Sequence, residues 1–296
     1  MASRAEDPTR PLYLFCHVPK CAGSTVEGHF DRHLPGRLLF PPRRRGFLRD
    51  LGGGYTDTRR LPEGLDTLDF VGGHSLSRRI ASHFPGRELR ECVLIREPVS
   101  LTVSYYNFRN KLAAQRGKGP APFEPFCRSL PRDVVCRFIL TRYLGIGYPQ
   151  LMRWDTARRF AETEKALSRF WFVGDVRHTE AMVQEISREL GIGEPPIIRE
   201  NVSNRDGDLK VADLAEEARQ EILARNPLDV LLHGRWAEVK WGPPPEPLAK
   251  TPPRGDQFAH LAFEIRRLIA GKEVERIRRA AASGSADRAT TGVERG

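Results

Sequence analysis

The 296-residue sequence has few cysteines, few lysines and no long apolar run. Its five cysteines, at positions 16, 21, 92, 127 and 136, are odd in number and lack paired C-x-x-C spacing. This pattern indicates neither a disulfide framework nor a zinc site, and we expect the cysteines to be small buried hydrophobic residues. No stretch approaches the roughly 18 consecutive apolar residues of a transmembrane helix, so we predict no membrane span.

The first residues also lack the apolar core that is typical of a secretory signal peptide. We therefore expect a cytoplasmic protein. The chain is long enough for one large domain with a full hydrophobic core. We predict a flexible N-terminus over residues 1–10 and a single domain over 11–242. Residues 243–296 are predicted to form a Pro-rich linker, an amphipathic helix and a disordered tail.

Basic residues give the chain a formal net charge of +10. A strong positive charge favours polyanionic partners, such as nucleic acid, an acidic membrane surface, a nucleotide donor or an acidic glycan, and does not choose among them. Only eight of the 48 basic residues are lysines, and Lys20 is the only lysine in the first 110 positions. A compact, rotatable ammonium at that position suits an oxygen that gains charge during a reaction.

Residues 12–25, LYLFCHVPKCAGST, combine an apolar run with a Gly-Ser-Thr turn. The run predicts a buried strand over residues 12–18, followed by a helix over residues 24–33. A strand that enters a helix through Gly23 leaves N–H groups unpaired at the positive end of the helix dipole, which attracts an anion. The backbone of Ala22 and Gly23, the hydroxyls of Ser24 and Thr25, and the ammonium of Lys20 are therefore predicted to hold a phosphate.

An ordinary exposed loop before a helix is the alternative interpretation of the same residues. The stretch also differs from the P-loop of nucleotide triphosphatases, G-x-x-x-x-G-K-[ST], because Lys20 precedes Gly23.

A second strand is predicted over residues 67–72, followed by Gly73 and His74 and then by a helix over residues 76–83. Open α/β sheets bind their ligands at the carboxyl ends of the strands. His74 is therefore a candidate general base, and a turn or helix-capping histidine is the alternative.

A third unit spans residues 91–107, ECVLIREPVSLTVSYYN. Residues 91–95 predict a buried strand, and Pro98 fits the first turn of a helix that continues to about Asn110. Arg96 comes at the end of this strand, and Ser104 comes a little over two helical turns later. An Arg fork and a serine hydroxyl that face one pocket could clamp a terminal phosphate.

These motifs resemble those of sulfotransferases that use 3′-phosphoadenosine 5′-phosphosulfate (PAPS). Residues 18–25 are similar to the pattern h-P-K-x-x-G-[ST]-[ST] of the glycan-modifying branch, and residues 95–106 are similar to h-R-[DE]-P-h-x-R-h-x-S-x-[YF]. The place of a second Arg in that pattern is held by Leu101 or Thr102 here. Gly73 and His74 resemble the Gly-His of the glycan 2-O-sulfotransferase branch. Weaker similarities lie at 137–145, 171–175, 200–204 and 226–232, so the resemblance covers about residues 11–240.

The resemblance implies a P-loop-like three-layer fold, in which helices flank a central parallel sheet. The residues alone indicate the same class, because predicted strands at 12–18, 67–72, 91–95 and 171–175 alternate with helices. It also implies transfer of a sulfuryl group from PAPS to a hydroxyl, with 3′-phosphoadenosine 5′-phosphate (PAP) as product and no metal requirement. We expect a carbohydrate acceptor, with an acidic glycan as one candidate, and no nucleic-acid partner.

In this interpretation, residues 22–25 hold the 5′-phosphate, Lys20 stabilises charge on the bridging oxygen, and Arg96 and Ser104 hold the 3′-phosphate. His74 takes the proton of the acceptor. Two alternatives stay open, a nucleotide or sugar kinase and a non-catalytic polyanion-binding protein. The oligomeric state is not indicated by the sequence.

Overall fold

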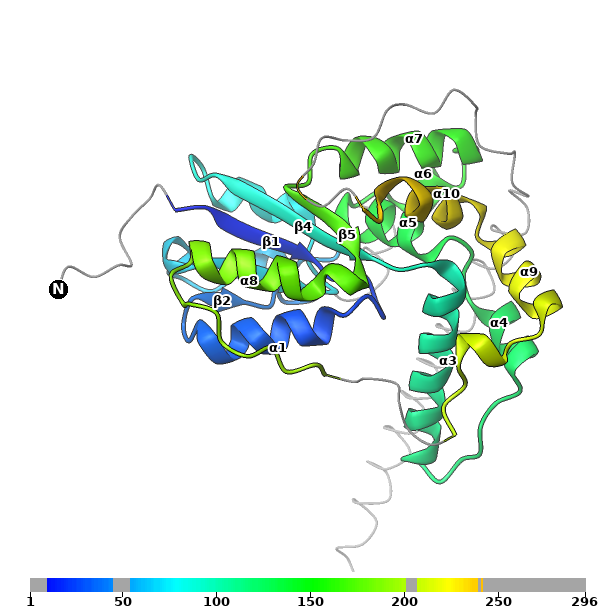
Figure 1. Ribbon diagram of the computed structural model, residues 1–296. Coiled ribbons are helices and arrows are strands. Elements are labelled where there is room, and N and C mark those ends of the chain that lie inside the picture. The colour runs from blue at the N-terminus through cyan, green and yellow to red at the C-terminus, as the bar shows by residue number, and fades with distance from the viewer. Residues whose placement is uncertain (1–9, 45–53, 201–206, 239–240, 242–296) are drawn as a thin grey trace, which may run out of the picture. The chain divides into compact units, whose positions relative to one another are not determined.

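A five-stranded parallel sheet forms the centre of the computed structural model, which describes residues 10–44, 54–200, 207–238 and 241. The sheet has the strand order β2-β3-β1-β4-β5, and every neighbouring pair is parallel (Figure 1). The strands are β1 (Leu12–Cys16), β2 (Leu38–Leu39), β3 (Phe70–Gly73), β4 (Leu89–Ile95) and β5 (Phe172–Asp175). The predicted α/β class with a parallel sheet is confirmed.

The strands form where apolar residues run without interruption. All five residues of β1 are buried, as expected for a central strand that is covered on both faces. The strand predicted over residues 67–72 begins later, at Phe70, because residues 65–67 form a turn of 3₁₀-helix. The strand β2 was not predicted, since only two residues in an Arg- and Pro-rich stretch pair with β3.

Helices flank the sheet. The helices α1 and α8 pack against each other on one side of the sheet, and α5, α7 and α10 form a second group (Figure 1). The α-helices are α1 (Gly23–His33), α3 (Pro98–Ala114), α4 (Phe123–Ser129), α5 (Val134–Phe138), α6 (Tyr148–Leu151), α7 (Thr156–Leu167), α8 (Thr179–Glu189), α9 (Glu216–Arg225) and α10 (Pro227–Trp236).

The helix α3 begins where the sequence predicts. Pro98 occupies its first turn, and the carboxylate of Glu97 accepts hydrogen bonds from the N–H groups of Val99 (2.9 Å) and Ser100 (2.7 Å). The helix continues to Ala114, four residues beyond the predicted end. The helix predicted over residues 76–83 is a 3₁₀-helix over Arg78–His83.

Two buried aspartates join α5 to α10. Asp133 accepts N–H groups from Leu228 (2.8 Å) and Asp229 (3.2 Å), at the start of α10. Asp229 in turn accepts the N–H groups of Val135 (2.8 Å) and Cys136 (2.9 Å), at the start of α5. Each carboxylate therefore caps the other helix. The chain leaves α5 through a π-helical segment, Ile139–Tyr143, which contains Arg142.

All five cysteines lie within the described residues, and each is buried and free, as predicted.

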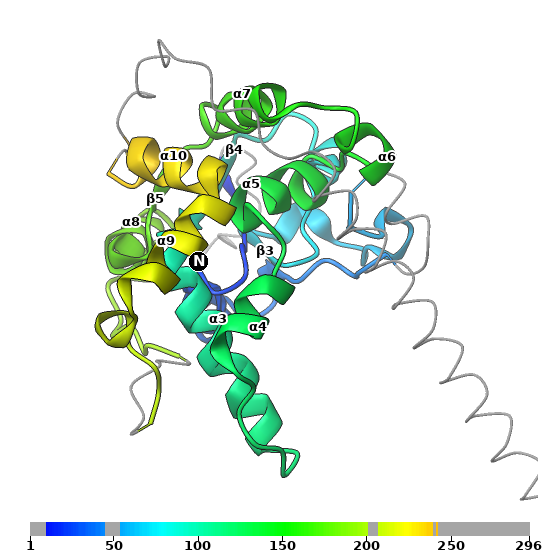
Figure 2. The ribbon, with the colours of Figure 1, turned by 90° about the vertical axis from the view of Figure 1, so that its right-hand side faces the viewer.

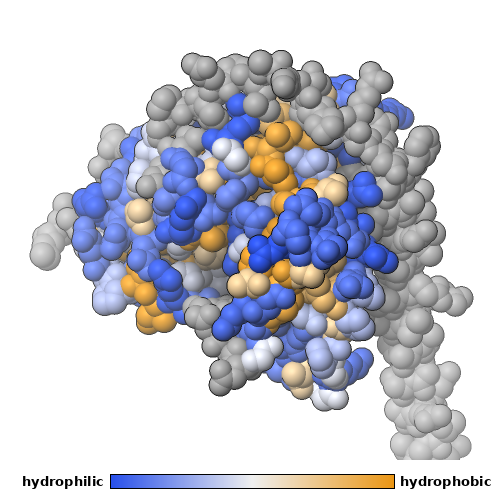
Figure 3. Space-filling model, turned by 45° about the vertical axis from the view of Figure 1, so that its right-hand side comes forward, coloured by the Kyte–Doolittle hydropathy of each residue, from blue (hydrophilic) through white to orange (hydrophobic). Residues whose placement is uncertain are grey.

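The surface in Figure 3 is mostly hydrophilic, with hydrophobic side chains gathered in a few places. None of the helices within the described ranges is long and apolar enough to cross a membrane. The N-terminal segment 1–9 and the predicted linker, helix and tail over 243–296 lie outside the described residues.

Candidate functional site

A cavity of about 680 Å³ lies at the carboxyl ends of the strands. The first residues after β1, β3, β4 and β5 are His17, His74, Arg96 and Val176, and all four line this cavity. Figure 2 looks onto this end of the sheet, with α3 descending from it. Parallel strands bring their carboxyl ends to one edge, so residues far apart in the sequence meet there.

The cavity brings together every residue that the sequence predicts for the site. Its lining includes Lys20, Ala22, Gly23, Ser24 and Thr25 from the loop after β1 and the start of α1, together with His74, Arg96 and Ser104. These residues come from three separate segments of the chain. The structure therefore places the two predicted phosphate-binding motifs and the predicted base around one space.

The loop between β1 and α1 has an unusual backbone. Lys20 and Ala22 adopt left-handed conformations, with φ of 66° and 56°, which for residues other than glycine cost on the order of 1–3 kcal/mol each. The turn leads directly into α1, whose N-cap residue Ala22 provides no side-chain cap. Among the described residues, the N–H groups of Ala22, Gly23 and Ser24 have no acceptor in the protein. They are available to an anion at the positive end of α1.

Gly23 is required at its position by a close contact. A Cβ atom added there would lie 1.9 Å from Cδ2 of His17 and 2.0 Å from Nε2 of the same ring. The ring of His17 therefore lies directly against the start of α1. Nearby, the hydroxyl of Thr25 accepts a hydrogen bond from the N–H of Glu200 (3.0 Å), so its hydrogen remains available for donation. The hydroxyls of Ser24 and Ser104 have no partner among the described residues.

Lys20 contacts an aromatic ring of α3. Its Nζ atom lies 4.1 Å from the centroid of the Phe108 ring, a cation–π contact. Burial, and then the charges of Arg96 and Lys111, lower the pKa of Lys20. No ion pair is found for its ammonium within the described part of the chain. This ammonium is therefore a cation that an anionic ligand can engage.

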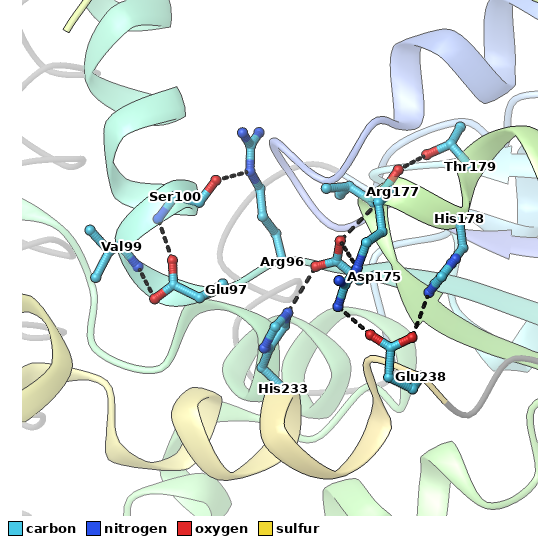
Figure 4. A network of polar contacts seen from close by, with 11 residues as sticks. Arg96, Glu97, Val99, Ser100, Asp175, Arg177, His178, Thr179, His233 and Glu238 are labelled. Atoms are coloured by element: carbon cyan, nitrogen blue, oxygen red, sulfur yellow. Dashed lines mark hydrogen bonds and ion pairs between the residues drawn. The ribbon is translucent and has the colours of Figure 1, made fainter. Parts of the chain in front are cut away.

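Arg96 connects β4, α3 and the loop after β1. Its Nε donates to Oγ of Ser100 (2.8 Å), and its Nη1 donates to the carbonyl oxygen of Lys20 (3.1 Å). Figure 4 shows the guanidinium turned toward Ser100 and away from Asp175. Its Nη2 has no hydrogen-bond partner among the residues described, which leaves donor capacity toward the cavity.

The tautomer of His74 follows from its contacts. Its Nδ1 lies 2.9 Å from the carbonyl oxygen of His17. Because a carbonyl oxygen only accepts, Nδ1 carries the hydrogen, and in the neutral ring Nε2 carries the lone pair. The residue lines the cavity and is exposed to solvent there. Desolvation by the surrounding protein, followed by the charge of His17, lowers the pKa of His74 to about 4, and the charges of Arg142 and Arg43 add to this effect. The hydrogen bond to the carbonyl oxygen of His17 acts in the opposite direction and raises the pKa. At neutral pH the ring is a free proton acceptor.

Carboxylates near the cavity are occupied by other partners. Glu180 pairs with Arg199 (2.7 Å), and Glu200 pairs with Arg32 (3.0 Å). These are the two carboxylates that line the cavity among the described residues. His74 is therefore the more available proton acceptor.

Asp175, at the end of β5, accepts hydrogen bonds from Nε2 of His233 (2.8 Å) and from the N–H of Arg177 (2.9 Å) (Figure 4). Burial by itself raises the pKa of Asp175, but these hydrogen bonds and the charges of His233 and Arg177 lower it overall. This carboxylate therefore anchors β5 to α10 and stays ionised.

Several lining residues were not predicted as site residues. His17, Phe108, Arg142, Arg177 and Arg199 are among them. Arg142 stacks on the rings of Tyr55 (4.2 Å) and Phe138 (5.4 Å). Arg142 lies inside residues 137–145, which carry a weaker similarity, and His17 directly precedes residues 18–25; these positions are the signal that could have found them. Leu101 and Thr102, which hold the place of the second Arg in the motif, are buried and do not line the cavity.

No protein-family model matches the chain, and no curated protein matches it. Within the described ranges, no group of three or more His, Cys, Asp or Glu side chains could hold a metal ion. The function of the cavity is therefore inferred from its own residues and geometry.

Proposed function

We propose that the protein is a sulfotransferase that transfers a sulfuryl group from PAPS to a hydroxyl of an acceptor, with the P-loop-like fold of that family. One observation carries the proposal. Both motifs that resemble the PAPS-binding segments, and the histidine that resembles the base, line the same cavity at the carboxyl ends of β1, β3 and β4.

The donor set of the cavity suits a ligand with two separate phosphates. The N–H groups of residues 22–24 and the hydroxyls of Ser24 and Thr25 would hold the 5′-phosphate. Arg96 and Ser104, from the next strand and helix, would hold the 3′-phosphate. The hydroxyls of Ser24 and Ser104 and the Nη2 of Arg96 have no partner within the part of the chain that the structure describes, which supports this assignment.

PAPS supplies the sulfuryl group, which forms a bond to the acceptor oxygen as PAP leaves. Lys20 would stabilise the negative charge that develops on the leaving phosphate oxygen. Nε2 of His74 would take the proton of the acceptor hydroxyl, because its lone pair is fixed by the Nδ1 hydrogen bond. Positioning and electrostatics would supply most of the rate enhancement.

We propose an acidic carbohydrate as the acceptor class. Arg43 and Arg142 line the cavity, and both are close enough to His74 for their charges to lower its pKa. A negative group on the acceptor would be attracted to the side of the cavity where the hydroxyl must lie.

Thermal unfolding with PAP tests the donor site. A ligand that binds only the folded state, at about 100 times its dissociation constant, stabilises by roughly 2.7 kcal/mol, or roughly 5–10 °C for a domain of this size. The expected result is such a shift with PAP and a much smaller one with 5′-AMP or ADP. An equal shift with ADP in the presence of magnesium would contradict the proposal and favour a kinase. No shift with any nucleotide would overturn it in favour of a polyanion-binding protein.

A further inference from the structure

Two histidines are stacked beside the proposed donor site. The ring centroids of His17 and His74 lie 3.8 Å apart, with an interplanar angle of 32°. His74 is accessible from the cavity, whereas His17 is only 4% exposed. His17 therefore forms the wall on which the ring of His74 rests.

A carboxylate on α1 holds His17. Oε1 of Glu27 lies 2.6 Å from Nδ1 of His17, and Glu27 is one helical turn beyond Gly23. A carboxylate oxygen in its ionised form only accepts, so Nδ1 of His17 carries a hydrogen whatever the charge of the ring. On its other edge, His17 is confined by the backbone at Gly23, where no Cβ fits. The ring is thus fixed by a hydrogen bond on one side and by close packing on the other.

His17 restrains His74 in two independent ways. Its carbonyl oxygen accepts from Nδ1 of His74, which sets the tautomer, and its ring face sets the plane of the imidazole. A base must present its lone pair within hydrogen-bond reach of the proton that it abstracts, so both restraints matter for transfer. Removal of a group that orients a reactive imidazole in this way lowers the rate of the reaction, although the group does not touch the substrate.

We propose that Glu27 and His17 are positioning residues for His74. Glu27 fixes the ring of His17, and His17 fixes the tautomer and orientation of His74. The kinetic consequence rests on the proposed function, whereas the structural consequence does not require any activity.

The structural consequence is tested by NMR of protein with ¹⁵N-labelled histidine at pH 7.5. The His74 signals are assigned with the His74→Gln variant. The expected result for His74 is the Nδ1–H tautomer in the wild type and in both Glu27 variants, because its acceptor is a backbone carbonyl oxygen. For His17, whose signals are assigned with His17→Gln, we expect a hydrogen fixed on Nδ1 in the wild type and in Glu27→Gln, which keeps a hydrogen-bond acceptor, and a mixture of tautomers in Glu27→Ala. The control Asp31→Ala removes an exposed carboxylate from the same helix and should keep the wild-type tautomer. An Nε2–H tautomer for His74 in the wild type, or unchanged nitrogen signals of His17 in Glu27→Ala, would overturn the proposal.

The kinetic consequence is tested by a double-mutant cycle. Glu27→Ala should lower kcat about ten- to a hundredfold, while the Kd for PAP stays within about twofold. Glu27→Gln should recover most of that loss. In the His74→Ala background, Glu27→Ala should cause no further loss, because the group that it positions is absent. An equal loss in both backgrounds, or a loss in Glu27→Gln as large as in Glu27→Ala, would contradict positioning through His74.

The two tests also separate this inference from the proposed function. A wild-type protein that shows the Nδ1–H tautomer but neither binds PAP nor transfers sulfuryl would refute the proposed function alone. A wild type that transfers sulfuryl while Glu27→Ala does so at full rate would refute the positioning role alone.

Discussion

Nη1 of Arg96 donates a hydrogen bond to the carbonyl oxygen of Lys20, over 3.1 Å. This contact joins the two motifs that the sequence assigns to different phosphates. Lys20 has a left-handed backbone, so Arg96 also stabilises a conformation that is costly by itself. The two predicted phosphate sites therefore depend on one guanidinium.

The first prediction concerns Arg96→Lys. A lysine keeps the charge but cannot donate to Ser100, to Lys20 and to a ligand with the same fixed geometry. We expect the affinity for PAP to fall by a factor of about 10–100, corresponding to the loss of one or two charge-assisted hydrogen bonds. Isothermal titration calorimetry gives the Kd. Arg109→Lys, an exposed position on α3, serves as the control, and equal Kd values for both variants would contradict the role of Arg96.

The second prediction compares two glycines. Gly23→Ala places a Cβ against the ring of His17 and should destabilise the protein by about 1–3 kcal/mol, while weakening PAP binding. Gly234→Ala, on the exposed face of α10 with no neighbouring atom within 4 Å, should stabilise by about 0.5–1 kcal/mol. Urea unfolding measures both free energies. A Gly23→Ala protein as stable as the wild type would show that the contact with His17 is not tight.

The third prediction concerns Lys20→Ala. Removal of the ammonium should lower kcat by about 10²–10³, as for the loss of one group that stabilises charge in the transition state. The Kd for PAP should rise as well, because the same charge faces the bound anion. Lys118→Ala removes an exposed lysine outside the cavity lining and is the matched control. Wild-type turnover in Lys20→Ala would exclude this lysine from the reaction.

The fourth prediction concerns the pH dependence of stability through His29. This residue of α1 is 1% exposed, and its Nε2 lies 3.1 Å from Oγ of Ser187. Burial, and then the charges of His33 and Arg32, lower its pKa from 6.5 to about 4. Between pH 6.5 and about pH 4, this histidine binds a proton in the unfolded chain but not in the folded protein. The stability of the fold therefore decreases as the pH falls.

Through His29, a decrease from pH 7.5 to pH 5 should lower the free energy of unfolding by roughly 2 kcal/mol. Urea unfolding at both pH values measures it. His29→Gln should show a smaller loss than the wild type, and His83→Gln, at an exposed position, controls for the removal of a histidine as such. Equal losses in the wild type and in His29→Gln would contradict the shifted pKa.

Local chemistry explains why much of the site could be predicted from the sequence. The apolar runs at 12–16 and 91–95 define buried strands, and the residues that follow a parallel strand must lie at its carboxyl end. Lys20, His74 and Arg96 could therefore be assigned to one edge of the sheet. The start of α3 at Pro98 could also be predicted, because its capping residue Glu97 is adjacent in the sequence.

The remaining features depend on contacts between distant residues. The pairing of His17 with Glu27 and the stacking on His74 arise only when β1, α1 and β3 are packed together. The hydrogen bond from Glu200 to Thr25 joins residues 175 positions apart. The two-residue strand β2 and the π-helical segment that contains Arg142 carry no sequence period by which to recognise them.

The most direct test of the central claim is transfer of ³⁵S from labelled PAPS to a panel of carbohydrate acceptors, by the wild type and by His74→Ala. We predict label in at least one acidic carbohydrate with the wild type. With His74→Ala we predict a transfer rate lower by a factor of about 10²–10⁴. This variant should still bind PAP with near wild-type affinity. Transfer by His74→Ala at the wild-type rate would contradict the assignment of the base. Tight binding of PAP with no labelled acceptor for either protein would contradict sulfuryl transfer to carbohydrates.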